Sequence, residues 1–189
     1  MISVIGISGV ARVGKDTFFR AIKRENPNGS MIRVAFADEL KEECNDFLMK
    51  NVGISAFTQD PNEKALVRPF LVTYGSQLRR KQDPSCWIKK VASKIRNLPE
   101  GDWKVVITDV RYPNELDWVH DEMKGTSIHI SREGLEPINE EEAKHDPTLR
   151  EMCHHKINVP NFNEDTCEES YVNYVNQMYE NNEEMYSVL

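Results

Sequence analysis

The sequence of 189 residues has no long apolar run and no cluster of basic residues. A membrane-spanning helix needs about 18 consecutive apolar residues, and no stretch approaches that length, so we expect no contact with a membrane. Lysine and arginine together number 24 against 31 aspartates and glutamates, which gives a net charge of -7. We therefore expect no duplex nucleic acid among the partners of this chain, because such partners bind basic surfaces.

Cysteine is also scarce, and the cysteines that are present are not paired in the sequence. Their wide spacing includes no C-x-x-C pair, which favours reduced thiols with a structural role over a disulfide framework or a zinc site. The four residues are Cys44, Cys86, Cys153 and Cys167.

Several histidines near one of these cysteines raise the question of a metal site. His154 and His155 are adjacent, and adjacent side chains of a strand point to opposite faces. Neither they nor His145 and Cys153 form a ligand pair with the spacing of a zinc finger. We interpret these side chains as solvated or packed and expect no metal there.

The length fits a single domain, since domains commonly have roughly 100 to 200 residues. Residues 1–6 contain no basic leader followed by a long apolar segment and a cleavage site, so a cytoplasmic location is expected. A homodimer is compatible with the sequence.

Short apolar runs alternate with segments of helical apolar spacing along the chain. This alternation predicts an α/β fold with a parallel sheet and right-handed crossovers. Strands are expected at residues 2–7, 31–35, 104–108, 126–131 and, with a weaker pattern, 155–159. Helical spacing begins at Lys15, Asp38 and Pro113, and recurs over residues 87–95 and 171–178.

Some element boundaries follow from residues that favour caps and turns. Asp38 is expected as the N-cap of its helix. Pro69 and Pro84 suit the first turn of a helix better than its middle. Residues 26–30 predict a turn and residues 53–62 a loop.

The sharpest motif lies between the first expected strand and the helix after it. Its glycines allow backbone N–H groups to surround a phosphate chain, the helix directs its positive end at the anion, and its lysine can reach the β and γ oxygens. This context predicts a nucleotide-binding P-loop rather than a glycine turn that happens to precede a lysine. The expected ATP-binding residues are Gly9, Ala11, Arg12, Val13, Gly14, Lys15, Asp16 and Thr17.

The P-loop departs from the usual pattern at the position after its lysine. That position commonly holds a serine or threonine whose hydroxyl binds Mg²⁺. Here it is Asp16, and the threonine follows as Thr17. We interpret Asp16 as approaching Mg²⁺ directly or through water, and Thr17 as bonding an α- or β-phosphate. The alternative is that Asp16 only caps its helix.

A second polar run, Asp109-Val110-Arg111-Tyr112-Pro113-Asn114-Glu115, follows the strand expected at 104–108. Ligands of open parallel sheets bind at the carboxyl ends of the strands, so Asp109 and Arg111 should face the same crevice as the P-loop. An aspartate there can hold Mg²⁺ through water, and an arginine can bind a phosphate through two N–H groups. A structural Asp–Arg ion pair is the alternative. The candidate metal residues are thus Asp16 and Asp109.

These motifs together resemble the deoxynucleoside monophosphate kinases, P-loop kinases of phages and bacteria. The resemblance covers most of the chain to about Arg132, and phosphomevalonate kinases of the same superfamily share parts of the pattern. It is carried by the Gly-Lys-Asp-Thr form of the P-loop, by Phe36–Lys41, by Tyr74–Arg80 with Asp83–Trp87, and by Asp109–Glu115.

The resemblance implies a P-loop NTPase-type three-layer fold with a helical acceptor-binding insertion at about residues 37–100 and a small lid at about residues 132–150. The lid segment is rich in glutamate and poor in large apolar residues, so we expect it to lie off the core and to move. By spacing, Arg80 rather than Arg79 takes the place of the family arginine.

The resemblance also assigns residues to the two substrates. The catalytic candidates are Lys15, Asp109, Arg111, Arg132 and Arg150. The acceptor-binding candidates are Asp38, Lys41, Arg68, Tyr74, Gly75, Arg80, Trp87 and Arg111. A solvated surface charge is the alternative for each lysine or arginine, and core packing for Trp87.

The sequence therefore predicts a Mg²⁺-dependent kinase that transfers the γ-phosphoryl group of ATP to a deoxynucleoside monophosphate. Two other interpretations remain open. One is a related P-loop kinase of the phosphomevalonate or dephospho-coenzyme A type. The other is a nucleotide-binding module without turnover.

Overall fold

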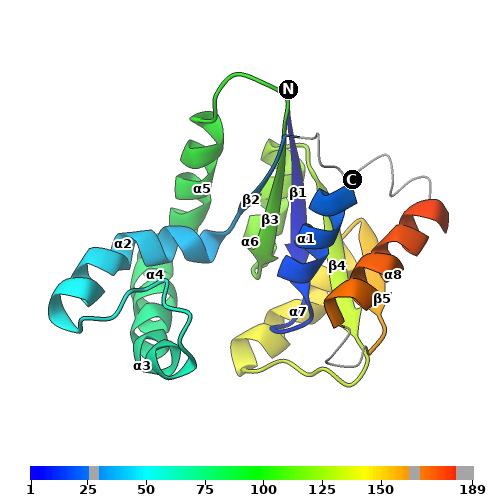
Figure 1. Ribbon diagram of the computed structural model, residues 1–189. Coiled ribbons are helices and arrows are strands. Elements are labelled where there is room, and N and C mark those ends of the chain that lie inside the picture. Colours follow the sequence, from blue (N-terminus) through cyan, green and yellow to red (C-terminus); the bar gives the residue numbers. More distant parts are fainter. Residues whose placement is uncertain (26–29, 162–166, 182–189) are drawn as a thin grey trace. The chain divides into compact units, whose positions relative to one another are not determined.

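The computed structural model describes residues 1–25, 30–161 and 167–181 (Figure 1). The chain divides into two compact units, the first formed by Met1–Val34 with Glu100–Leu189 and the second by Ala35–Pro99. The expected turn at 26–30 falls almost wholly outside the described residues. Each unit is considered separately below.

The first unit is built on a five-stranded sheet in the order β2-β3-β1-β4-β5, in which every pair is parallel. All five expected strands are confirmed. They are β1 (Ile2–Ser8), β2 (Met31–Val34), β3 (Trp103–Val110), β4 (Thr126–Arg132) and β5 (His155–Val159).

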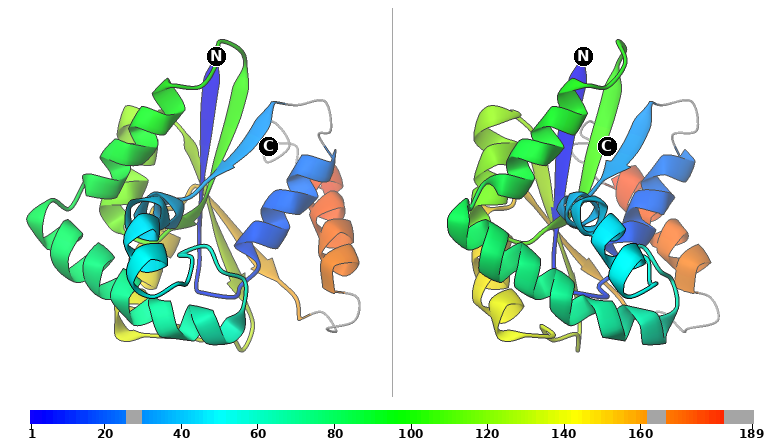
Figure 2. Two further views of the ribbon diagram at one scale, coloured as in Figure 1. Left: turned by 60° about the vertical axis from the view of Figure 1, so that its left-hand side comes forward. Right: turned by 90° about the vertical axis from the view of Figure 1, so that its left-hand side faces the viewer.

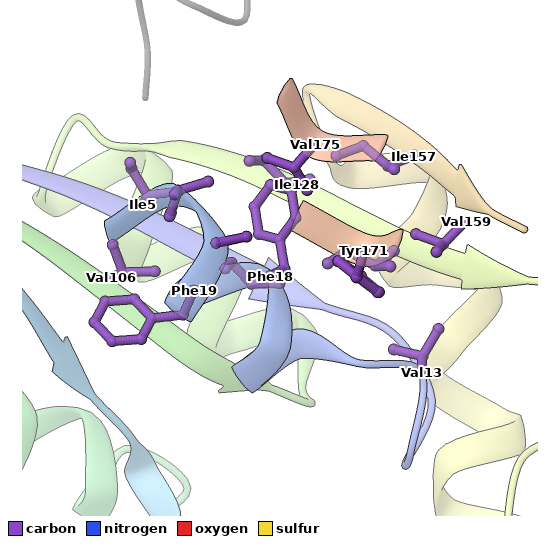
Figure 3. Packing of buried hydrophobic residues seen from close by; sticks show 14 of the residues in the cluster. Ile5, Val13, Phe18, Phe19, Val106, Ile128, Ile157, Val159, Tyr171 and Val175 are labelled. Atoms are coloured by element: carbon purple, nitrogen blue, oxygen red, sulfur yellow. The ribbon is translucent and has the colours of Figure 1, made fainter. Parts of the chain in front are cut away.

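One face of this sheet is covered by α1 (Lys15–Glu25) and α8 (Cys167–Asn181). Side chains alternate along a strand, so Ile5 and Ile7 of β1 both point to this face. There they join Phe18 of α1 and Tyr171 of α8, which are fully buried (Figure 3). Isoleucine and valine side chains of β3, β4 and β5 belong to the same apolar layer. The loop between β1 and α1 packs against this layer, which holds the loop in position.

The other face carries α6 (Pro113–Asp117), the π-helical turn η2 (Trp118–Glu122) and α7 (Glu140–Met152). Figure 2 shows these helices in lime and yellow on one side of the strands, with α1 and α8 on the opposite side. The expected α/β class is confirmed: helices lie on both faces of a parallel sheet, and a loop connects β1 to α1.

This second face is partly polar. The Ser8 hydroxyl lies 3.2 Å from the Cys153 sulfur, and His120 Nε2 lies 2.7 Å from the Ser127 hydroxyl. Cys153, Cys44 and Cys86 are buried free thiols, and burial raises the pKa of each. The side chain of Cys167 is outside the described part of the chain.

The second unit is helical and has its own small core of Cys44, Leu48, Ala56 and Val67. Asp60 caps its second helix by accepting bonds from the backbone N–H groups of residues 62 and 63. The elements are α2 (Phe36–Asn51), α3 (Pro61–Val72), the π-helical segment η1 (Thr73–Arg79), α4 (Arg80–Gln82) and α5 (Cys86–Arg96).

Three expected boundaries are wrong. Helix α2 begins at Phe36, so Asp38 lies in its first turn and not at its N-cap. Pro69 lies inside α3, whose first turn instead contains Pro61, and the π-helical segment η1 follows four residues later. A proline removes one backbone hydrogen bond of a helix, and tertiary packing of the neighbouring Val67 outweighs that cost here. Pro84 precedes α5 and is not part of it.

The expectation that residues 132–150 lie off the core is also wrong in part. Helix α7 includes most of the segment and extends to Met152, and Leu149 is only 2% exposed. No helix of the described residues is long and apolar enough to span a membrane.

Candidate functional site

The loop between β1 and α1 has backbone geometry that requires glycine at its first position. Gly9 has a φ of 129°, and a Cβ there would lie 2.2 Å from the carbonyl oxygen of Ile130. Gly14 also has a positive φ, as does Arg12, which adopts the left-handed conformation without being a glycine. A loop of this shape, followed at once by the N–H groups at the start of α1, is suited to surround an anion.

Lys15 is the first residue of α1 and is only 9% exposed. Its Nζ donates hydrogen bonds to the carbonyl oxygens of Gly9, at 2.6 Å, and Val10, at 2.9 Å. Burial, and next the positive charge of Arg111, lower the pKa of Lys15 to about 8. The ammonium group is thus held over the loop and is poorly solvated, so a bound anion would stabilise it strongly.

Asp16 follows Lys15 and is held by two side chains from neighbouring strands. Its Oδ1 accepts hydrogen bonds from Arg33 Nε, at 2.8 Å, and from the Thr108 hydroxyl, at 3.0 Å. Burial by itself raises the pKa of Asp16, but Arg33, Thr108 and Lys15 outweigh it and lower the pKa below its usual value. Asp16 is therefore a charged carboxylate with a fixed orientation.

Thr17, by contrast, makes its hydrogen bond within its own helix. Its hydroxyl accepts a bond from Arg20 at 3.1 Å on an exposed surface. That bond leaves the hydroxyl free to accept or donate further, so a phosphate-binding role for Thr17 stays a prediction.

The turn after β3 holds Arg111 at the same end of the sheet. The buried carboxylate of Glu115 accepts hydrogen bonds from the backbone N–H groups of Arg111, at 2.8 Å, and Tyr112, at 3.1 Å. Asp109 is 9% exposed and its charge acts on Lys15, as does the charge of Arg111. Asp109 and Arg111 therefore belong to the surroundings of the P-loop lysine.

A side chain that the sequence did not point to occupies this site. The Glu142 carboxylate, from the first turn of α7, accepts a hydrogen bond from the backbone N–H of Ala11 at 2.9 Å. The same Oε1 lies 3.8 Å from Arg111 Nη1, and the side chain is 10% exposed. A carboxylate thus lies on a backbone amide of this loop and beside an arginine, at the place where the sequence predicts a bound phosphate.

The two arginines assigned to the expected lid differ in their surroundings. Arg132 Nη2 donates to the carbonyl oxygen of Val13 at 3.1 Å, directly on the P-loop. Arg150 is exposed. Both line a cavity of about 290 Å³ that also includes His129 and Asp146.

The donor set around Lys15 suits Mg²⁺. Mg²⁺ is commonly held by one or two carboxylates together with substrate phosphates and water. Asp16 and Asp109 offer two carboxylates whose charges both reach Lys15. Among residues 1–25, 30–161 and 167–181, no group of three or more His, Cys, Asp and Glu side chains is arranged as an all-protein metal site.

Three acceptor candidates lie together in the second unit. The Tyr74 hydroxyl donates to Glu43, and Trp87 Nε1 donates to the carbonyl oxygen of Gly75 at 3.4 Å. Trp87 is 2% exposed, which agrees with the alternative of core packing. A Cβ at Gly75 would lie 2.8 Å from a methyl group of Leu40, so that side chain would have to shift.

The structure adds two residues to this cluster that were not among the acceptor candidates. Arg79 Nε lies 2.9 Å from Glu43 and its guanidinium lies 5.7 Å from the ring centre of Trp87. Lys90 Nζ lies 3.0 Å from the other oxygen of Glu43. Arg79 is thus held rigidly beside Tyr74 and Trp87.

The remaining acceptor candidates are on the surface of the second unit. Lys41 forms an ion pair with Asp38 at 3.8 Å and lies over the ring of Phe57. Arg68 is exposed, and Arg80 is half-buried in the turn after η1. The acceptor roles of these four residues stay predictions.

The comparisons with known proteins find little. No family model and no curated protein matches the chain. Among solved structures, a gluconokinase from Sinorhizobium meliloti 1021 is similar at 15% identity and a TM-score of 0.42, over 95% of this chain and 94% of that one. A dephospho-CoA kinase from Campylobacter jejuni is similar at 12% identity and a TM-score of 0.38, over 95% and 98%.

A shikimate kinase from Acinetobacter baumannii is also similar, at 11% identity and a TM-score of 0.43, over 96% of this chain and 95% of that one. Likeness at this level does not decide what the chain acts on.

Proposed function

We propose that this protein is an ATP-dependent kinase whose acceptor is a deoxynucleoside monophosphate. The observation that carries the proposal is the P-loop, in which a buried lysine of lowered pKa lies at the start of a helix with Arg111, Asp109 and Asp16 around it. Such a set of groups suits a transferring phosphoryl group better than it suits any neutral ligand.

Phosphoryl transfer to a monophosphate requires little covalent catalysis by the protein. The second pKa of a monophosphate is about 6, so near neutral pH its oxygen is already a nucleophile and needs no strong general base. The barrier lies in aligning two highly charged groups. Lys15 and Arg111 would offset this charge, and Asp16 and Asp109 would hold Mg²⁺, which would supply further positive charge as a Lewis acid.

The choice of acceptor depends on the resemblance and on the second unit. Tyr74 and Arg79 are fixed by Glu43, which gives this unit an ordered aromatic and cationic group of the kind that binds a nucleotide. Arg80 and Arg111 are proposed to bind the acceptor phosphate. A kinase for another phosphorylated small molecule would keep the P-loop and use a different insertion.

One coupled assay tests the activity. Acceptor-dependent release of ADP from Mg²⁺-ATP should appear with one or more deoxynucleoside monophosphates and be weaker with the matching ribonucleotides, with mevalonate phosphate and with dephospho-coenzyme A. Equal rates with deoxy and ribo acceptors would remove the deoxy preference. No acceptor-dependent release with any of them would leave only a binding module.

Lys15→Met should reduce that turnover at least about a thousandfold, because the charge opposite the developing phosphate charge is lost. The matched control is Lys156→Met, which removes an exposed lysine of β5 in the same unit. Circular dichroism should show both variants folded. Turnover of Lys15→Met within threefold of the control would contradict the P-loop as the catalytic site.

A further inference from the structure

Helix α7 brings a carboxylate to the P-loop through contacts that are all within the first unit. Glu142 Oε1 accepts the Ala11 N–H and faces Arg111, while its Oε2 accepts the backbone N–H of Ile138 at 3.0 Å. Asn139 caps the helix by accepting the N–H of Glu142 at 2.8 Å. In this structure the Glu142 carboxylate is therefore held in one orientation by contacts on both of its oxygens.

The contacts of Glu142 are those that a phosphate oxygen would make in a P-loop. They comprise one loop amide, one arginine and the charge of Lys15, whose pKa is raised by the Glu142 carboxylate against the effects of burial and Arg111. A carboxylate is planar and a phosphate is tetrahedral, but both present anionic oxygens that accept hydrogen bonds from N–H groups. A carboxylate and a phosphate cannot both bind this N–H group at the same time, because their negative charges repel.

We propose that Glu142 is an internal competitor of the nucleotide: it occupies the anion position of the P-loop when no nucleotide is bound and must leave before a phosphate can enter. This inference rests on the proposed nucleotide site and deepens it. In the absence of nucleotide the proposed lid is then closed, with Glu142 bound to the P-loop; we call this the self-bound state. It is separate from any role of the lid arginines during turnover.

The rest of α7 explains how the acid could leave without unfolding the helix. The later part of the helix is held by Leu149, which is buried, and by Asp146, whose Oδ1 lies 3.0 Å from Nε2 of the buried His129. Pro147 lies between these two residues and has no N–H, so the carbonyl of Ala143 lacks its helical partner. Release of Glu142 thus costs a few polar contacts of the first turn and leaves the buried contacts intact.

The energetic consequence is a lower apparent affinity for nucleotide. If the P-loop is free in only a fraction of the molecules, the apparent dissociation constant rises by the inverse of that fraction. A self-bound state populated at about 90% would weaken nucleotide binding about tenfold. Removing the acid should recover that factor.

The test uses Glu142→Ala, Glu142→Gln and the control Glu140→Gln in the full chain. Glu140 is the exposed first residue of the same helix, so the control removes the same charge from the same turn without touching Ala11. Hydrogen exchange of the peptide containing the Ala11 amide is measured without nucleotide, and Mg²⁺-ADP is then titrated by calorimetry.

We expect faster exchange at Ala11 and about tenfold tighter ADP binding in Glu142→Ala, a smaller change in Glu142→Gln, and no change in Glu140→Gln. Unchanged exchange in Glu142→Ala would overturn the proposal whatever the nucleotide result. Faster exchange with unchanged or weaker ADP binding would make Glu142 a structural acid only. If wild type and all variants failed to bind ADP, the nucleotide site itself would be wrong, and this outcome is distinct from the first two.

Discussion

The P-loop and the first turn of α7 meet at the same site but are held in place by different forces. The loop is bounded by the fully buried Val13 and by Gly9, whose backbone touches Ile130 so closely that no side chain fits between them. The first turn of α7 is held by single hydrogen bonds from Ala11 and Ile138 to Glu142. The shape of the loop is therefore set by core packing, and that of the turn by exchangeable polar contacts.

The difference indicates which side of the site is rigid and which can move. Segments that open at low cost have few buried apolar contacts and hydrogen bonds near solvent. Of the α7 residues, only Leu149 is buried, and it lies near the far end of the helix. We expect the loop to keep its form while the turn carrying Glu142 leaves and returns.

Adding a methyl group at Gly9 of the loop and at Gly134, in the segment that leads into α7, should give the largest contrast. Gly9→Ala combines a disallowed φ of 129° with a clash at Ile130, so the free energy of unfolding should fall by about 3 kcal/mol or more. Gly134→Ala, in the lid segment, has a φ of 75° and nothing within 4 Å of the new Cβ, so the loss should be about 1 kcal/mol. Urea unfolding of both variants measures the two values, and equal losses would contradict the proposed difference in rigidity.

The pH dependence of nucleotide binding should report the charge of Lys15. Its pKa of about 8 means that between pH 7 and pH 8 the ammonium form predominates, and the dissociation constant for ADP should change little. Bound phosphates stabilise the ammonium and raise its pKa, so above pH 8 binding must take up a proton and should weaken by up to about tenfold per pH unit. Calorimetric titrations between pH 7 and 10 measure this change.

Glu142 should shift that pH profile. Glu142 raises the pKa of Lys15, so in Glu142→Ala the weakening should begin at a lower pH than in wild type. Glu140→Gln should follow the wild-type curve, and Lys15→Met should bind weakly with no break near pH 8. A wild-type profile that stays flat to pH 10 would show that Lys15 does not titrate in this range.

Much of the fold could be predicted from the sequence because its signals are local. The continuous apolar run Val105–Ile107 and the β-branched run at the N-terminus predict buried strands, and the glycines beside Lys15 predict the loop. Pro69 was placed wrongly because tertiary packing of α3 outweighs a local preference. Asp60 followed by Pro61 and Glu63 is a local signal for the start of that helix, and it agrees with the observed N-cap.

The candidate site could be predicted only in part, since its remaining contacts are long-range. Asn139 followed by Glu142 suggests a helix start, but nothing local shows that the acid reaches Ala11, 131 positions away in the sequence. The pairing of Arg33 with Asp16 and of Tyr74 with Glu43 is likewise a product of the tertiary fold. Spacing favoured Arg80 over Arg79, whereas the contacts with Glu43 and Trp87 are made by Arg79.

The smallest expected effect separates Arg132 from Arg150, the two arginines proposed to act in a lid. Arg132 lies on the carbonyl of Val13, beside Gly14, whereas Arg150 is exposed. Arg132→Ala should therefore lower kcat about tenfold and Arg150→Ala about threefold or less, with the KM for ATP little changed in both, because charge near a transferring phosphoryl group acts mainly in the transition state. The lysine variants provide the control: Arg132→Lys should recover only part of the loss, because an ammonium cannot reproduce the planar N–H groups that reach Val13. If Arg150→Ala lowered kcat more than Arg132→Ala, the far end of α7 would have to approach the phosphates during turnover, and the division between a fixed end and a moving first turn would be reversed.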